Sequence, residues 1–137
     1  MIEIFSDGTK VLVVTGIPYD SGRITEIIDL ENPSYTCNKV QPIPINLAGA
    51  TGGLVEDKPM VCGGSTEYGY SRTCFSLQEN GEWMEIISPS EEPVVLNVPK
   101  GYAASGSVTM NNKLVVAGGR GLDSTSFSTI ELVSPNG

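Results

Sequence analysis

The side chains most capable of chemistry in this chain are three cysteines, Cys37, Cys62 and Cys74. No histidine accompanies them among the 137 residues, so the commonest general base and every Ser-His or Cys-His nucleophilic pair are missing. No Cys-x-x-Cys spacing occurs, and two or three thiolates without imidazole make a poor zinc site. We therefore expect neither enzyme activity nor a cofactor.

Cys62 and Cys74 stand on either side of a segment centred near Tyr68. If that segment is a hairpin, the two cysteines are directly opposed, within the Cβ separation that a disulfide needs. The alternative is two small buried thiols, and both states stay open at this point. Because the number of cysteines is odd, Cys37 is then left as a lone thiol.

The charge balance limits the possible partners. Sixteen acidic and eight basic side chains give a net charge of -8, which disfavours a phosphate backbone or an anionic membrane as a partner. No apolar run approaches the roughly 18 residues that span a bilayer, and the N-terminal segment lacks the pattern of a signal peptide. We expect no nucleic-acid or membrane partner, and either a cytoplasmic or an extracellular location.

The cysteine side chains must be positioned by a repeated sequence element. Lys58-Pro-Met-Val-Cys-Gly-Gly64 recurs as Lys113-Leu-Val-Val-Ala-Gly-Gly119 and, in degraded form, as Lys10-Val-Leu-Val-Val-Thr-Gly16. Each copy is a short apolar run that stops at glycine, which is typical of a strand followed by a turn. The period of about 50 residues favours a propeller or an array of repeats.

The remaining pattern predicts an all-β chain, because no 3.6-residue periodicity extends over ten residues. Turns predicted at Asp7-Gly8, Glu56-Asp57, Asn80-Gly81 and Asn111-Asn112 separate the apolar runs. We expect eleven strands, near residues 2–5, 11–14, 24–30, 35–40, 49–55, 60–62, 73–77, 83–87, 103–110, 114–117 and 128–133. The first strands of the second and third units are rich in Gly, Ala and Ser, which indicates a crowded axis.

The chain resembles the kelch-repeat family, in which an apolar strand ends in a glycine doublet and a later strand opens with tryptophan. Gly63-Gly64 and Gly118-Gly119 match the doublet, Gly16 keeps its second glycine, and Trp83 matches the tryptophan. The resemblance implies a β-propeller fragment of about three blades built from four-stranded antiparallel sheets. The implied blades are 1–46, 47–99 and an incomplete third, 100–137.

In kelch domains the loops after the glycine doublets, with those joining blades, form a face that commonly binds a peptide or protein. By that resemblance the candidate partner-binding residues are Tyr19, Arg23, Tyr68, Tyr70, Arg72, Tyr102, Arg120 and Asp123. The implied function is a non-catalytic protein-binding module. The alternatives are an extracellular carbohydrate-binding or enzyme-associated propeller and a plain scaffold, and uncovered blade faces predict self-association.

Overall fold

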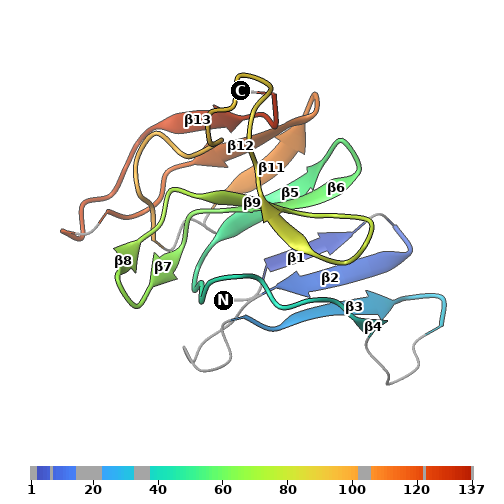
Figure 1. The fold of residues 1–137 in the computed structure, drawn as a ribbon. Coiled ribbons are helices and arrows are strands. Elements are labelled where there is room, and N and C mark those ends of the chain that lie inside the picture. The colour runs from blue at the N-terminus through green and yellow to red at the C-terminus, as the bar shows by residue number, and fades with distance from the viewer. Residues whose placement is uncertain are drawn as a thin grey trace.

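The computed structural model of the protein describes residues 3–6, 8–14, 23–32, 38–101, 106–121 and 123–136. Throughout these residues the chain is all-β, with thirteen strands and no helix. The absence of a helix agrees with the lack of helical periodicity in the sequence. Figure 1 shows three sheets arranged one after another along the molecule, together with a separate short hairpin.

Each of the three sheets is antiparallel, and its strands neighbour one another in chain order. The first sheet consists of β1 (Glu3–Ser6), β2 (Lys10–Val14), β3 (Thr25–Asp29) and β4 (Asn38–Lys39). The second consists of β5 (Thr51–Val55), β6 (Lys58–Cys62), β9 (Cys74–Leu77) and β10 (Trp83–Glu85). The third consists of β11 (Ser107–Met110), β12 (Lys113–Ala117) and β13 (Ile130–Val133).

Short turns with left-handed backbone join the first two strands of the second and third sheets. Glu56 and Asp57 have φ of 52° and 60°, and Asn111 and Asn112 have φ of 51° and 56°. Two successive positive φ values match the twist of the flanking strands, which is why such turns are favoured in two-residue hairpins. The predicted turns at both places are confirmed.

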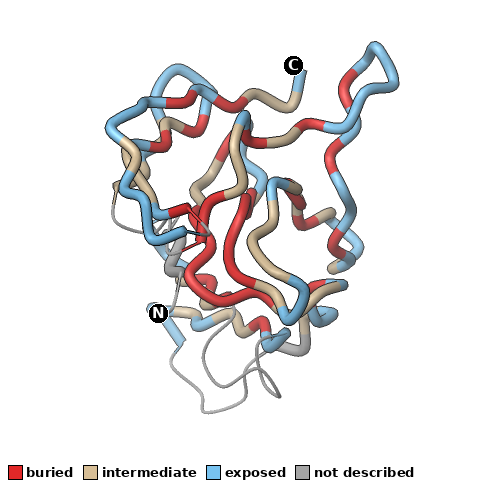
Figure 2. Tube along the Cα trace, turned by 90° about the vertical axis from the view of Figure 1, so that its left-hand side faces the viewer, coloured by how far each residue is buried: buried red, intermediate tan, exposed pale blue. Residues whose placement is uncertain are grey.

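Two apolar clusters hold the three sheets together. The first lies between the first and second sheets and contains Leu12, Val14, Ile43, Leu47, Ala50, Val61, Phe75, Leu77 and Trp83. The second lies between the second and third sheets and contains Val55, Met60, Cys62, Cys74, Ile86, Val94, Leu96, Leu114, Val116 and Val133. Strand β6 contributes to both, because successive side chains of a strand point to opposite faces. Buried positions accordingly gather in the middle of the molecule (Figure 2).

The close approach of β5 to the third sheet explains the small residues in β5. A Cβ added at Gly53 would lie 2.4 Å from Thr109 Oγ1 and 3.2 Å from Leu114 Cδ1. The Ser107 hydroxyl donates to the Gly52 carbonyl over 3.1 Å across the same contact. Glycine is therefore required at position 53 for steric reasons.

The structure differs from the predicted strands at their ends and in one loop. Gly49 and Ala50 precede β5, and the chain leaves β10 before Ile86. The long connection from β6 to β9 contains two short paired strands, β7 (Ser65–Thr66) and β8 (Gly69–Tyr70), that are not among the eleven expected strands. Such two-residue strands carry no apolar alternation that the sequence could show. The expected strand positions 35–37 and 103–105 lie outside the described residues.

Candidate functional site

The glycine doublets start two loops on the same side of the sheets. Gly63, Gly64, Gly118 and Gly119 all have positive φ, between 69° and 109°, a backbone conformation that glycine adopts without the cost of a Cβ. The β7–β8 hairpin and the β12–β13 connection lie on one side of the molecule, opposite the tight turns at Glu56 and Asn111 (Figure 1). We call this side, made of residues 23–24, 44–46, 65–73, 118–121 and 123–129, the loop end.

A hollow of about 400 Å³ opens at the loop end. It is lined by Arg23, Pro44, Ile45, Asn46, Thr66, Glu67, Tyr68, Gly69, Tyr70 and Ser71. Three of the predicted partner-binding residues, Arg23, Tyr68 and Tyr70, therefore meet around one concave surface. The lining combines two phenol rings, apolar prolyl and isoleucyl groups and one charge of each sign, a mixture common at protein-binding sites.

The β7–β8 hairpin presents its two tyrosines differently. Tyr68 is 91% exposed at the tip, and its backbone N–H donates to Thr66 Oγ1 over 3.1 Å. The Thr66 hydroxyl in turn donates to the Gly69 carbonyl over 2.9 Å, which fixes the turn. Tyr70 lies against Gly101, where an added Cβ would come within 2.5 Å of the ring. Tyr68 is thus free to contact a partner, whereas Tyr70 is held by the neighbouring segment.

Arg23 and Arg72 occupy matching places and both support the backbone. Arg23 lies two residues before Thr25, the register partner of Val14 at the end of β2. Arg72 lies two residues before Cys74, the register partner of Cys62 at the end of β6. Arg23 Nε donates to the Ile43 carbonyl over 2.9 Å, and the Ile43 N–H donates back to the Arg23 carbonyl over 3.2 Å.

Arg72 makes the same reciprocal contacts with Leu96. Its Nε donates to the Leu96 carbonyl over 2.7 Å, and the Leu96 N–H donates to the Arg72 carbonyl over 2.9 Å. Ile43 and Leu96 are fully buried members of the two clusters. The loop arginines therefore anchor the segments that follow the first and second sheets, a structural role that the sequence did not predict. Arg72 does not line the hollow.

Arg120 and Asp123 lie in the β12–β13 connection, outside the hollow. The Arg120 backbone exchanges two hydrogen bonds with Gly101, of 3.0 and 3.2 Å, while its side chain is exposed. The Asp123 carboxylate accepts from the Thr125 N–H over 3.1 Å. Hydrogen bonds from the Thr125 side chain and backbone lower the pKa of Asp123 below its ordinary value of 3.8. Tyr19 and Tyr102 lie outside the described residues.

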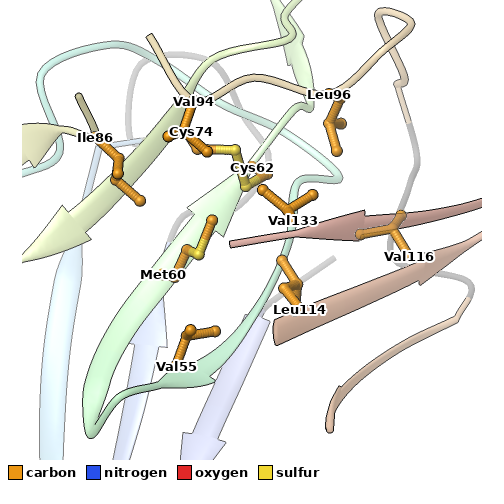
Figure 3. Close-up of a cluster of buried hydrophobic side chains, with 10 residues drawn as sticks. All are labelled: Val55, Met60, Cys62, Cys74, Ile86, Val94, Leu96, Leu114, Val116 and Val133. Atoms are coloured by element: carbon orange, nitrogen blue, oxygen red, sulfur yellow. A yellow bond between two sulfur atoms is a disulfide. The ribbon is translucent and has the colours of Figure 1, made fainter. Parts of the chain in front are cut away.

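Cys62 and Cys74 form a disulfide with an S–S distance of 2.07 Å. They are direct register partners on β6 and β9, and the hairpin that separates them turns at Glu67 and Tyr68. Both cysteines are fully buried in the second cluster, beside Met60 and Val94 (Figure 3). The bridge is therefore enclosed within the protein interior rather than exposed at the loop end.

A buried ion pair that the sequence analysis missed lies behind the β12–β13 connection. Lys100 Nζ is 2.6 Å from Glu131 Oε1, and neither atom has another hydrogen-bond partner among the described residues. Glu131 Oε2 accepts from the Asn97 N–H over 2.6 Å, and Lys100 Nζ lies 5.7 Å from the centroid of the Phe127 ring. Matching Lys100 to Leu47 of the preceding repeat would have indicated a buried position.

The described residues provide no group of three or more cysteine or acidic side chains that could hold a metal ion. They also contain no helix long and apolar enough to cross a membrane. The loop end presents aromatic and hydrogen-bonding side chains, with few charges, around a hollow. Such a surface is suited to binding.

The comparisons with known proteins concern the fold. A scan of family models and a search of curated proteins gave no match. The solved structure of YjhT matches with a TM-score of 0.78 at 19% sequence identity, over 97% of this chain and 42% of that one. This chain thus spans less than half the length of YjhT. Similarity at this identity establishes a shared all-β fold and carries no function with it.

Proposed function

We propose that the three sheets are consecutive blades of a kelch-type β-propeller. Support comes from the equivalent register pairs Val14–Thr25, Cys62–Cys74 and Ala117–Ile130, which place the same strands at the same positions in all three sheets. The positive-φ glycine doublets follow the second strand of two of these sheets, as in kelch repeats. The packing of sheets face to face is also what successive propeller blades require.

We further propose that this part of the propeller is a non-catalytic protein-binding module, and that a protein or peptide binds at the loop end. The observation that carries the proposal is the convergence of Arg23, Tyr68 and Tyr70 on one hollow. Tyr68 presents a nearly fully exposed ring on a hairpin whose turn is fixed by Thr66. Rigid, exposed tyrosine beside a concave surface is typical of interface hot spots.

Selection of a displayed peptide library on the wild-type chain tests this proposal. We expect Tyr68→Ala to weaken binding of the selected peptides about tenfold or more, because hot-spot truncation commonly costs about 2 kcal/mol. The melting temperature should stay the same, since Tyr68 is 91% exposed. Met84→Ala is the matched control, because Met84 is an exposed apolar residue of β10 that does not line the hollow. Equal affinities for wild type and Tyr68→Ala would reject the loop-end site.

A second candidate function is favoured by the Cys62–Cys74 disulfide. Disulfides persist in oxidising compartments, so the bridge supports an extracellular propeller in which tyrosines of the hollow stack on sugar rings. A glycan panel probed with the wild-type chain and with Tyr68→Ala discriminates the two candidates. Saturable glycan binding that depends on Tyr68, without peptide selection, would favour the carbohydrate-binding function.

A further inference from the structure

A second hollow lies between the first and second sheets, at the side opposite the loop end, and we call it the turn-end hollow. Its volume is about 390 Å³. Most of its lining is apolar and comes from Leu12, Ile27, Leu54, Pro59 and Leu77. Two charged residues complete the lining, Lys10 from the first sheet and Asp57 from the second. An apolar hollow of about 300 to 1,000 Å³ with a few polar groups is typical of a binding site.

The contact between the second and third sheets shows how the same place can be occupied. By register, the first-sheet lining residues Lys10, Leu12 and Ile27 correspond to Lys58, Met60 and Ser76 of the second sheet. The space that these second-sheet residues line is only about 100 Å³, and Pro135 lines it as well. The next residue, Asn136, donates from Nδ2 to Glu56 Oε1 over 3.2 Å. At this contact a short peptide segment therefore presents an apolar ring to the space and a polar group to a carboxylate of the turn.

The turn-end hollow has no such apolar residue from the corresponding segment. Glu79 corresponds to Pro135, because each lies five residues after the equivalent positions Cys74 and Ile130. The Glu79 side chain is exposed and borders an adjoining space of about 220 Å³. This second space shares Asp57, Pro59 and Leu77 with the turn-end hollow. The place that the second contact gives to proline is thus bordered by a carboxylate at the first contact.

The charges around the two adjoining spaces favour a positively charged partner. Three acidic residues, Glu56, Asp57 and Glu79, stand there beside two basic ones, Lys10 and Lys58. The whole chain adds to this balance with a net charge of -8. Charge complementarity raises the rate of encounter and fixes the orientation of a bound partner. The two-residue turn, in which Asp57 has a φ of 60°, sets the position of this carboxylate.

We propose that the turn-end hollow binds a peptide segment of a partner protein that carries one apolar side chain between two basic residues. The apolar side chain enters the hollow and packs on Leu12, Leu54 and Leu77. The basic residues on either side of it meet the Asp57 and Glu79 carboxylates at the rim. The site is separate from the loop end, so this inference does not depend on binding there.

Tripeptides with acetylated and amidated ends test the proposal directly. The probes are Lys-X-Lys, in which X is Leu, Phe or Pro, and the comparison peptides are Glu-X-Glu and Lys-Gly-Lys. We expect at least one Lys-X-Lys peptide to bind saturably with a Kd at or below about 1 mM, and the comparison peptides to bind at least about tenfold more weakly. Methyl NMR of the wild-type chain follows the titration, through the signals of Leu12, Ile27, Leu54 and Leu77.

Two pairs of substitutions separate a specific rim from the general negative charge of the chain. Asp57→Asn/Glu79→Gln should raise the Kd of the bound Lys-X-Lys peptide about fivefold, because two contacts between opposite charges are lost. Asparagine suits this turn, since the equivalent Asn112 has a φ of 56°. Glu85→Gln/Glu92→Gln is the matched control, with the same change in net charge at exposed positions that do not line either space. Tyr68→Ala at the loop end should also leave the Kd unchanged.

Four results would overturn the proposal. The first is the absence of methyl shifts with every Lys-X-Lys peptide at about 10 mM, well above the expected Kd. The second is equal binding of Glu-X-Glu or Lys-Gly-Lys, which would show that the basic or the apolar residues of the probe are not recognised. The third is an equal loss of affinity in the two double variants. The fourth is a set of shifts confined to Ile45 and its neighbours at the loop end.

Discussion

Lys100 and Glu131 form an ion pair, with 2.6 Å between Nζ and Oε1, at the place where the preceding contact between sheets has Leu47 and Phe75. The equivalence follows from the backbone pairs Ala48–Ser65 and Gly101–Arg120, and from the register of Phe75 and Glu131 in their strands. Lys100 is fully buried and Glu131 is 5% exposed. One repeat therefore fills this position with apolar side chains, and the next fills it with opposite charges.

The apolar pair provides a template for testing the ion pair. We expect Lys100→Leu alone to cost about 3 to 5 kcal/mol, because it leaves the Glu131 carboxylate buried without its partner. The double variant Lys100→Leu/Glu131→Phe should recover at least about 1 kcal/mol of that loss, although the Asn97 N–H then lacks its acceptor. Urea unfolding of the wild type, both single variants and the double variant measures the coupling. Purely additive losses of unfolding free energy in the double variant would contradict an energetic coupling between Lys100 and Glu131.

Arg72 is expected to contribute to stability even though its side chain reaches the surface. Arg72→Ala removes the 2.7 Å hydrogen bond to the Leu96 carbonyl, and we expect a loss of about 1 to 2 kcal/mol. Arg120→Ala is the matched control, since this side chain is exposed in a neighbouring loop, and it should change stability by less than about 0.5 kcal/mol. Thermal unfolding compares the two. Equal effects would mean that the Arg72 contact is energetically unimportant.

The sequence predicted the regular strands better than the contacts between sheets. Runs such as Val11–Val14 and Leu114–Ala117 are rich in β-branched residues, which favour strands. The turn residues Asn111 and Asn112 mark the boundary between two neighbouring strands. The anchoring role of Arg72 and the buried state of Lys100 depend on partners 24 and 31 positions away. Charged residues are usually exposed, so a sequence pattern does not reveal such long-range pairing.

Part of the candidate site was predictable, because loops after glycine doublets carry their tyrosines at one end of the sheets. The resemblance to kelch repeats assigned Tyr68, Tyr70 and Arg23 to one loop face, and in the structure these three residues line one hollow. It gave no information on side-chain direction within the loop. Tyr68 is at the hairpin tip, whereas Tyr70 rests on Gly101. The different exposure of the two rings depends on the three-dimensional path of residues 100–101, which the sequence pattern does not show.

Trp83 joins the first two sheets through its ring and its N–H group. The residue is 6% exposed, and Nε1 donates to Thr25 Oγ1 over 3.2 Å. We expect Trp83→Ala to destabilise the fold by about 3 to 5 kcal/mol. Thr25→Val, which keeps the shape and removes the acceptor, should cost about 1 to 3 kcal/mol. Chemical denaturation measures both, and a loss below about 1 kcal/mol for Trp83→Ala would place the ring outside the core.

The Asp123 turn is expected to respond to acid. Hydrogen bonds from Thr125 lower the pKa of Asp123 below 3.8, so the ionised carboxylate stabilises the folded turn. This contribution is present above the pKa of the unfolded chain and is lost as the pH falls through the lower, folded pKa. Thr125→Val should raise the pKa of Asp123 towards its ordinary value, whereas Thr129→Val in the same connection should not. Carbon chemical shifts of the Asp123 carboxyl follow the titration, and identical curves for wild type and Thr125→Val would refute the assignment.

The disulfide can be tested by a thiol count and by a substitution copied from the third sheet. With Cys62 and Cys74 bridged, the denatured, unreduced chain should show one free thiol, that of Cys37, and three after reduction. Cys62→Ala/Cys74→Ile reproduces the third sheet's Ala117 and Ile130, which keeps the position apolar and removes the cross-link. We expect it to lower the unfolding free energy by about 2 to 4 kcal/mol, since the bridge restricts the unfolded chain. Reducing agent should destabilise the wild type and leave this variant unchanged, and three free thiols before reduction would contradict the bridge.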